Sequence, residues 1–219
     1  MARLKDVLAP RPRLLLVGIN PGLRSGAVGH HFAGNGNPFW RLLYEARLIP
    51  RALTYEEDQE LARFGIALTN LCERPTRSAA ELTPADIERG RRKLAKKCAA
   101  LRPRVVAFVG LSVYQAFFRL PRSGGAGEKP ETLAGARVFV VPNPSGLNAS
   151  FPGFRHKLVW FEALARFVRR ASAGRVPRAR RERQASELVG RSDLRAADAR
   201  ERRASPQVRA KRRAPPRPR

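Results

Sequence analysis

Residues 14–22 read Leu-Leu-Leu-Val-Gly-Ile-Asn-Pro-Gly, an apolar run that ends in a tight polar turn. The run is short, continuous and bounded by Pro12 and Gly18, which predicts a strand buried on both faces. Pro21 fixes its own φ and disfavours helix at Asn20, so the chain must turn sharply at the carboxyl end of this strand. Open parallel sheets bind their ligands at that end. The turn is therefore the first candidate site.

A second segment repeats this design. Residues 138–146 read Val-Phe-Val-Val-Pro-Asn-Pro-Ser-Gly, again an apolar run that leads into an Asn-Pro turn. Either turn alone is explained almost as well by simple chain reversal as by function. Two buried strands that both end in Asn-Pro predict two loops that meet over one cleft.

The composition is strongly basic. The 219 residues include 44 Lys and Arg against 18 Asp and Glu, which gives a net charge of +26. An apolar content of 43% is enough for a core, so the chain is not disordered throughout. A solvated surface does not need such an imbalance. We therefore expect an anionic polymer as partner, with nucleic acid ahead of an acidic membrane surface.

Cysteine usage and hydropathy narrow the class of protein. Cys72 and Cys98 lie far apart without a ligand spacing, so a four-cysteine iron-sulfur or zinc site is excluded, and we expect no metal and no cofactor. No run is long enough for a membrane span, and the first residues lack the apolar core of a secretory signal. We expect a soluble, cytoplasmic monomer without a membrane partner, associated with the nucleoid if the source is bacterial.

Strand and helix patterns alternate over most of the chain. We expect four strands, at residues 14–17, 65–71, 105–110 and 137–141. We expect helices that start at or near Asn37, Thr54, Thr83, Val113 and Phe154. This alternation predicts an α/β fold, a three-layer α/β/α arrangement with a central, mainly parallel four-stranded sheet. Residues 23–37 are rich in glycine and show no periodicity, so we expect a long functional loop there.

The composition changes near residue 171. Residues 171–219 hold 16 Lys and Arg against 5 Asp and Glu and contain no aromatic residue. Such a segment cannot bury enough apolar surface to offset the entropy of ordering. We expect a folded catalytic domain over residues 1–170 and a disordered Arg-, Pro- and Ala-rich tail over residues 171–219. The tail is either a solvated extension or a nonspecific contact to DNA phosphates.

Four segments of the chain, in order, carry a family resemblance. They are residues 18–23 (Gly-Ile-Asn-Pro-Gly-Leu), residues 29–32 (Gly-His-His-Phe) with Asn37, Phe39 and Trp40, Thr69-Asn70-Leu71 with Glu73 and Arg74, and residues 142–147 (Pro-Asn-Pro-Ser-Gly-Leu). In this order and at these spacings the chain resembles the mismatch-specific uracil/thymine-DNA glycosylases, a branch of the uracil-DNA glycosylase superfamily. The resemblance runs from about residue 13 to about residue 168.

The resemblance implies an enzyme of base excision repair. Its partner would be double-stranded DNA with a mismatched or damaged pyrimidine, and the reaction would flip uracil out of a G·U mismatch and hydrolyse its N-glycosidic bond. Acceptance of thymine or other altered pyrimidines stays open. No lysine matches a Schiff-base nucleophile, so we expect a monofunctional glycosylase without strand cleavage. The alternative is a non-catalytic DNA-binding protein that retains the glycosylase fold.

The same resemblance assigns roles around the first turn. Asn20 matches the residue that positions the attacking water; an amide cannot serve as general base at pH 7. Phe32 matches the ring that stacks on the flipped base, and backbone groups of Ile19 and Phe32 would read the pyrimidine edge. His31 would donate a hydrogen bond to a base oxygen, unless it is an ordinary surface histidine. The full set of implied substrate-binding residues is Gly18, Ile19, Ser25, His31, Phe32 and Asn70.

The second turn would contact the duplex. Leu147 matches the apolar wedge that fills the space left by an extruded base, and Gly146 would allow close approach to the opposite base. The competing interpretation is that Leu147 is an ordinary turn residue. The implied DNA-binding residues are Asn143, Ser145, Gly146, Leu147 and Asn148. A nucleotide-binding enzyme is disfavoured because the sequence has no phosphate-binding loop of either common type.

Overall fold

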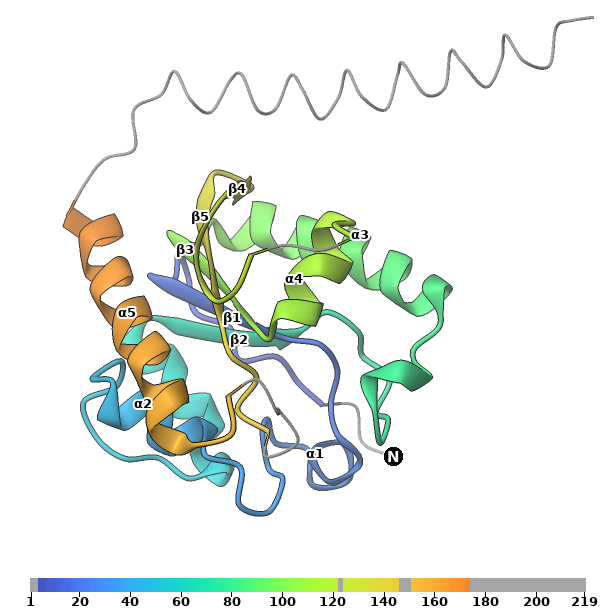
Figure 1. Ribbon diagram of the computed structural model, residues 1–219, viewed down its shortest axis with the longest axis horizontal. Helices are drawn as coiled ribbons and strands as arrows, with labels where there is room; N and C mark the ends of the chain where they lie inside the picture. Colours follow the sequence, from blue (N-terminus) through green and yellow to red (C-terminus); the bar gives the residue numbers. More distant parts are fainter. Residues whose placement is uncertain (1–3, 122–123, 146–150, 174–219) are drawn as a thin grey trace, which may run out of the picture. The chain divides into compact units, whose positions relative to one another are not determined.

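Four parallel strands form the centre of the molecule, shown in Figure 1 as a computed structural model that describes residues 4–121, 124–145 and 151–173. The sheet has five strands in the order β2-β1-β3-β5-β4. The parallel strands are β1 (Leu14–Gly18), β2 (Ile66–Asn70), β3 (Val105–Val109) and β5 (Ala136–Val141). β4 (Gly127–Leu133) pairs antiparallel with β5 at one edge.

Helices cover both faces of the sheet. One face carries α2 (Phe39–Glu45), α5 (Phe154–Ala173) and the 3-10 helix η1 (Tyr55–Phe64), and the other carries α3 (Pro84–Leu101) and α4 (Leu111–Phe118) (Figure 1). Side chains alternate between the two cores along each strand: Leu16 packs toward α2 and α5, and Leu15 packs on the other side. Because both faces are buried, the strands are apolar at almost every position. The predicted three-layer α/β/α fold is confirmed.

The fifth strand is a difference from the prediction of four. β4 reads Gly-Glu-Lys-Pro-Glu-Thr-Leu and is polar because it lies at an edge, where only part of its surface is covered. Pro130 cannot donate to a strand ladder, and the pairing with β5 is irregular between Lys129 and Thr132. A strand with this composition has none of the alternation that identifies a strand in sequence.

Residues 23–37 were expected to form one long loop, but the structure has a short helix at their start. α1 (Leu23–Val28) is a six-residue helix that ends at Gly29, whose φ is 79°. Gly26 allows it to pack against Pro75, because a Cβ at residue 26 would lie 2.6 Å from Pro75 Cγ. A helix shorter than two turns has too few positions for an apolar period to show in the sequence. The remaining Gly-rich segment forms the wall described below.

The ends of most predicted elements agree with the structure. α3 begins at Pro84 behind the predicted cap Thr83, whose hydroxyl accepts the backbone N–H of Asp86 at 3.1 Å. The expected helix at residues 55–64 is instead the 3-10 helix η1 with a kink at Glu57. Among the described residues, no helix combines the length and apolar character that crossing a membrane requires. The predicted tail lies outside the described residues from residue 174 onward.

Candidate active site

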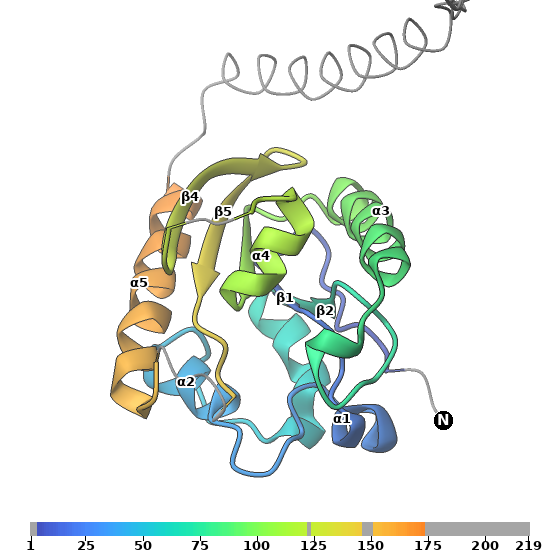
Figure 2. The same ribbon diagram turned by 45° about the vertical axis from the view of Figure 1, so that its right-hand side comes forward.

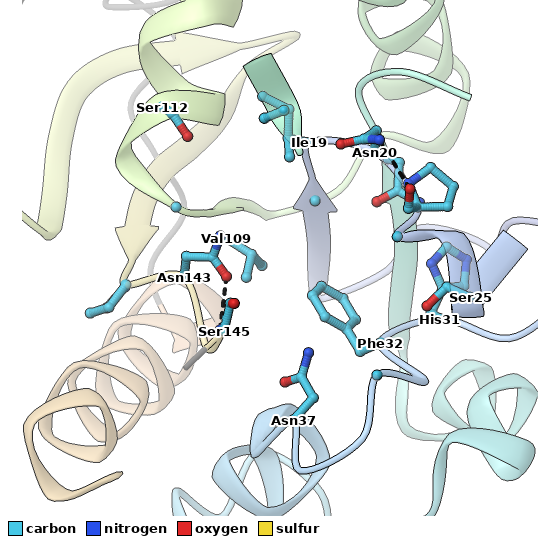
Figure 3. A pocket seen from close by; sticks show the side chains of 18 of the residues that line it. Ile19, Asn20, Ser25, His31, Phe32, Asn37, Val109, Ser112, Asn143 and Ser145 are labelled. Carbon is cyan, nitrogen blue, oxygen red and sulfur yellow. Dashed lines mark hydrogen bonds between the residues drawn. The ribbon is translucent and has the colours of Figure 1, made fainter. Parts of the chain in front are cut away.

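A cavity of about 800 Å³ opens at the carboxyl ends of the parallel strands. Its wall includes the last residues of those strands, Gly18, Asn70, Val109 and Val141. Asn20 and Asn143, from the two Asn-Pro turns, also line it (Figure 3). Two loops that are more than a hundred residues apart in sequence therefore face one cavity, at the edge of the sheet where parallel folds bind ligands.

The carboxamide of Asn20 is fixed through its nitrogen. Nδ2 lies 2.7 Å from Thr76 Oγ1, 3.0 Å from the Pro21 carbonyl oxygen and 3.1 Å from the Arg74 carbonyl oxygen. These acceptors determine which end of the amide is nitrogen, because an oxygen there could not donate. Oδ1 lies on the opposite side and accepts no hydrogen bond from the described residues (Figure 3). A fixed acceptor at a cavity wall can orient one water molecule.

Gly18 makes room for the side chain of Asn70. A Cβ at residue 18 would lie 2.4 Å from Asn70 Oδ1 and 3.6 Å from Phe32 Cζ. The glycine, the amide and the ring therefore enclose a narrow part of the cavity. The Asn70 side chain has no hydrogen-bond partner among the described residues, so its amide can both donate to and accept from a bound group.

Phe32 is held in an unusual backbone conformation. Its φ is 51°, in the left-handed region that bulky residues rarely adopt. Its ring stacks on the buried ring of Phe39 in α2, with centroids 3.7 Å apart and planes inclined by 15°. Because one face of the Phe32 ring is covered, only the other face and the edge can meet a ligand. Strain of this kind is typical of functional sites.

Ser25 shapes the loop that carries Phe32. It is 6% exposed, and its Oγ accepts the backbone N–H of Ala33 at 3.1 Å. Ile19, also at the cavity wall, is fixed through its carbonyl oxygen, which accepts the N–H of Cys72 at 2.8 Å. Both residues line the cavity, as the resemblance implies. Both also form hydrogen bonds that fix the backbone of the cavity wall.

His31 lies beside the cavity, but its ring forms a hydrogen bond with the backbone of Lys5. It is 2% exposed, its backbone N–H donates to Asp58 Oδ2 at 3.0 Å, and its Nε2 lies 3.0 Å from the Lys5 carbonyl oxygen. Burial lowers the pKa of His31, so the ring is neutral at pH 7 and has a single N–H. A carbonyl can only accept, so that N–H is on Nε2. In this arrangement the ring has no donor left for a base oxygen, and the interpretation of His31 as a surface residue also fails.

Asn37 is a cavity residue whose contribution the sequence did not reveal. Its Oδ1 accepts the backbone N–H of Phe39, the first residue of α2, at 3.0 Å. The cap position is Pro38, one residue after the predicted cap, so Asn37 supports the start of the helix from just outside it. That bond turns Nδ2 toward the cavity, where it has no partner among the described residues (Figure 3). The capping pattern of Asn-Pro explained the residue fully, so no further signal pointed to a second role.

The second Asn-Pro turn is held from beneath by a buried lysine. Asn143 Oδ1 accepts the backbone N–H of Ser145 at 3.0 Å. Lys157 of α5 is 2% exposed, and its Nζ donates to the carbonyl oxygens of Pro144 and Ser145 at 3.2 and 3.1 Å. Burial lowers the pKa of this ammonium, and no carboxylate pairs with it in the part of the chain that the structure describes. Nothing in the sequence distinguishes Lys157 from a surface lysine.

Replacing Lys157 by methionine should loosen this turn. Methionine has a similar length but cannot donate, so two buried carbonyl oxygens would lose their partner, at a cost of roughly 1–3 kcal/mol. We expect hydrogen exchange at the amides of Asn143 and Ser145, the residues of this turn that carry an N–H, to become about ten- to a hundredfold faster, measured by mass spectrometry. Lys93→Met, which removes an exposed ammonium paired with Glu73, is the matched control and should change nothing there. Unchanged exchange in Lys157→Met would contradict the anchoring role.

The structure describes two of the five residues assigned to the second turn. Gly146, Leu147 and Asn148 lie outside the described residues, so the wedge stays a prediction. Asn143 and Ser145, the other two, are at the cavity wall.

The described lining of the cavity contains no Asp or Glu and two arginines, Arg24 and Arg77. Within residues 4–121, 124–145 and 151–173, no three His, Cys, Asp or Glu side chains gather in a way that could hold a metal ion. Besides these two arginines and His31, the polar and aromatic groups of the lining are amides, hydroxyls, phenyl rings and backbone. Such a site can orient a water molecule and stabilise a developing anion with neutral donors, but it offers no carboxylate base.

Comparison with known proteins gives two findings. The model of the family described as the uracil DNA glycosylase superfamily matches residues 5–165. A solution NMR structure of a protein from Methanosarcina acetivorans, described as a "putative Uracil DNA glycosylase", superposes with a TM-score of 0.52 at 20% sequence identity. The match covers 74% of this chain and 97% of that chain. At this identity the structural likeness shows a shared fold.

Proposed function

Because the chain belongs to the uracil DNA glycosylase superfamily, we propose that it is a monofunctional DNA glycosylase that acts on uracil in G·U-type mismatches of duplex DNA. The observation that carries this proposal is the orientation of Asn20, whose nitrogen is fixed by three acceptors and whose oxygen is left toward the cavity. The reaction would leave an abasic site and so initiate base excision repair.

The proposed reaction needs a positioned water rather than a base. Asn20 Oδ1 accepts a hydrogen bond from the water and directs its oxygen at C1′ of the deoxyribose. The C1′–N1 bond breaks with its electron pair passing to the base, which leaves as an anion, and the proton of the attacking water passes to solvent. With no carboxylate in the described lining, the rate depends on how good the leaving base is.

The base would be held by the ring and the amides around Gly18. Stacking on the free face of Phe32 contributes roughly 1–3 kcal/mol. The Asn70 amide can donate to a base oxygen and accept from the N3–H of a pyrimidine. A neutral donor near a base oxygen, such as Asn37 Nδ2, also stabilises the departing anion. These groups replace the hydrogen bond that the sequence assigned to His31.

This chemistry favours bases that leave or flip easily. A G·U mismatch is weaker than a normal pair, so extrusion of its uracil costs less. Ser25 lines the cavity, and its hydroxyl accepts the backbone N–H of Ala33. Because Ser25 is already bonded to that backbone, we propose uracil as the preferred substrate and treat thymine as a test arm.

Leu147 is proposed as the wedge that replaces the flipped base in the stack. Leu147→Ala should therefore lower cleavage most where the target base is well paired, by about tenfold for uracil opposite adenine and by less than threefold for uracil opposite an abasic site. Single-turnover rates on the two duplexes measure this difference. An equal loss on both would show that Leu147 is an ordinary turn residue.

One experiment separates the enzyme from a binding protein that keeps the fold. Full-length protein is incubated in excess with duplexes that carry uracil or thymine opposite guanine or adenine, and abasic sites are then cleaved with alkali. We expect product with G·U at least tenfold faster than with any other pair. Binding to all duplexes without product from any of them would favour the non-catalytic alternative.

A further inference from the structure

Six arginines gather at the amino ends of the strands, the end of the sheet opposite the cavity. Arg13 directly precedes β1 and Arg104 directly precedes β3, and the first residues of these strands, Leu14 and Val105, pair with each other. The set, called here the arginine face, consists of Arg11, Arg13, Arg47, Arg102, Arg104 and Arg169.

Contacts between their elements place these arginines on one surface. Arg104 donates from its backbone N–H to the Pro12 carbonyl oxygen at 3.0 Å and from Nη1 to the Ser172 carbonyl oxygen of α5 at 3.0 Å. Arg13 donates to the carbonyl oxygens of Phe64 and Leu48, so it lies beside the chain segment of Arg47.

The charge of Arg169 acts on the guanidinium of Arg13. Burial lowers the pKa of Arg13, and the positive charge of Arg169 lowers it further. The charges of Arg13 and Arg169 therefore repel each other, and an anion bound at this surface would reduce that repulsion.

The charge of the arginine face is not neutralised by any carboxylate in the part of the chain that the structure describes. Five of its six members are exposed, and none lies within ion-pair distance of a carboxylate in the described residues. Some arginines elsewhere are paired: Arg89, Arg91 and Arg92 on α3 each have an acidic partner three or four residues away. Arg24 and Arg77 at the cavity, in contrast, form no ion pair with a described carboxylate. The arginine face is therefore a cluster of positive charge without an ion-pair partner among the described residues.

The arginine face is separate from the cavity. The strands between them have five residues, which corresponds to about 16 Å. In Figure 2 the arrowhead of β5 points toward the side of α1, whereas α5 ends at the opposite side. A duplex whose base enters the cavity lies across the carboxyl ends of the strands, so its backbone does not reach the amino ends.

We propose that the arginine face binds the phosphate backbone of a second DNA duplex. The ligand is identified by the side chains, because the planar guanidinium of arginine matches two phosphate oxygens at once. Contact without base readout would make this binding independent of sequence and sensitive to salt. A protein that holds two duplexes can pass from one to the other without first being released. The proposal does not depend on glycosidic cleavage.

A capture experiment tests the arginine face on the full-length protein. One uracil-free duplex is immobilised and loaded with protein, and a second, labelled duplex of different sequence is then added. The variant Arg47→Asn/Arg169→Gln removes two charges of the face. The control Arg119→Asn/Arg92→Gln removes two charges elsewhere. Its backbone is matched, because φ is 56° at Arg47 and 57° at Arg119. Asparagine tolerates this left-handed conformation at both positions.

We expect the unaltered protein and the control to capture the labelled duplex, and the face variant to capture at least tenfold less. The slope of capture against the logarithm of salt concentration should decrease by about two in the face variant, close to one unit for each lost phosphate contact. Equal capture by the face variant and the control would overturn the proposal and assign bridging to another part of the chain. Absence of capture by the unaltered protein, or equal competition by polyglutamate at the same charge, would overturn it as well.

Discussion

Replacing Asn20 by alanine is expected to lower the single-turnover rate of uracil release about 100- to 1,000-fold, with little change in the affinity for duplex DNA. The side chain is at the wall of the cavity, and within the described residues it forms hydrogen bonds only with its own turn and with residues 74 and 76, so its loss leaves the strands and both cores intact. What disappears is the fixed acceptor that orients water. Alkali cleavage of abasic product measures the rate, and a filter-binding or anisotropy titration measures the affinity.

Two companion variants separate positioning from general-base catalysis. In Asn20→Asp a carboxylate oxygen would replace Nδ2 beside two carbonyl oxygens, which it would repel, so the rate should stay low although a base has been introduced. In Thr76→Val the amide loses its shortest bond, at 2.7 Å, and we expect a smaller loss of about tenfold. A rate in Asn20→Ala within threefold of the unaltered protein would contradict the assigned role.

The sequence predicts most of the fold because both faces of the sheet are buried. Continuous apolar runs at β1, β3 and β5 leave few alternatives to buried parallel strands, and the two Asn-Pro turns point to the cavity at their ends. The elements that it misses carry little apolar signal. β4 is a polar edge strand with an internal proline, and α1 is too short to show a period.

The sequence predicts which residues reach the cavity, but it does not predict which hydrogen bonds their side chains form there. Asn20, Phe32 and Asn70 reach the cavity as expected. His31 does not offer a free donor, because the partner of its ring is the carbonyl of Lys5, and a backbone atom 26 residues away leaves no trace in the sequence. Lys157 and Asn37 are missed for the same reason. The role of Lys157 depends on the carbonyl oxygens that its ammonium contacts, and the role of Asn37 depends on the direction of its amide nitrogen. The sequence around a lysine or around the start of a helix is the same whether or not the side chain borders a cavity.

Gly18→Ala should block the part of the cavity that the base is proposed to enter. Gly18 does not have a left-handed φ, so alanine fits the backbone, and the strand should lose less than about 1 kcal/mol of stability. The added Cβ would lie 2.4 Å from Asn70 Oδ1 and 3.6 Å from Phe32 Cζ, which forces the amide away and fills the gap beside the ring. We expect cleavage of G·U to decrease roughly 100-fold, since displacements of about 1 Å have effects of this size.

A double-mutant cycle identifies which of these two effects of the Gly18→Ala methyl group matters. If displacement of the amide explains the loss, Asn70→Ala alone should be as slow as Gly18→Ala, and combining them should add nothing. If the methyl group occupies the place of the base, the double variant should be at least tenfold slower than Asn70→Ala, and we expect this second result because the Cβ also contacts the ring. Gly124→Ala, where a Cβ meets no atom within 4 Å, is the control and should cleave normally. Normal cleavage by Gly18→Ala with an unchanged thermal midpoint would mean that the base binds elsewhere.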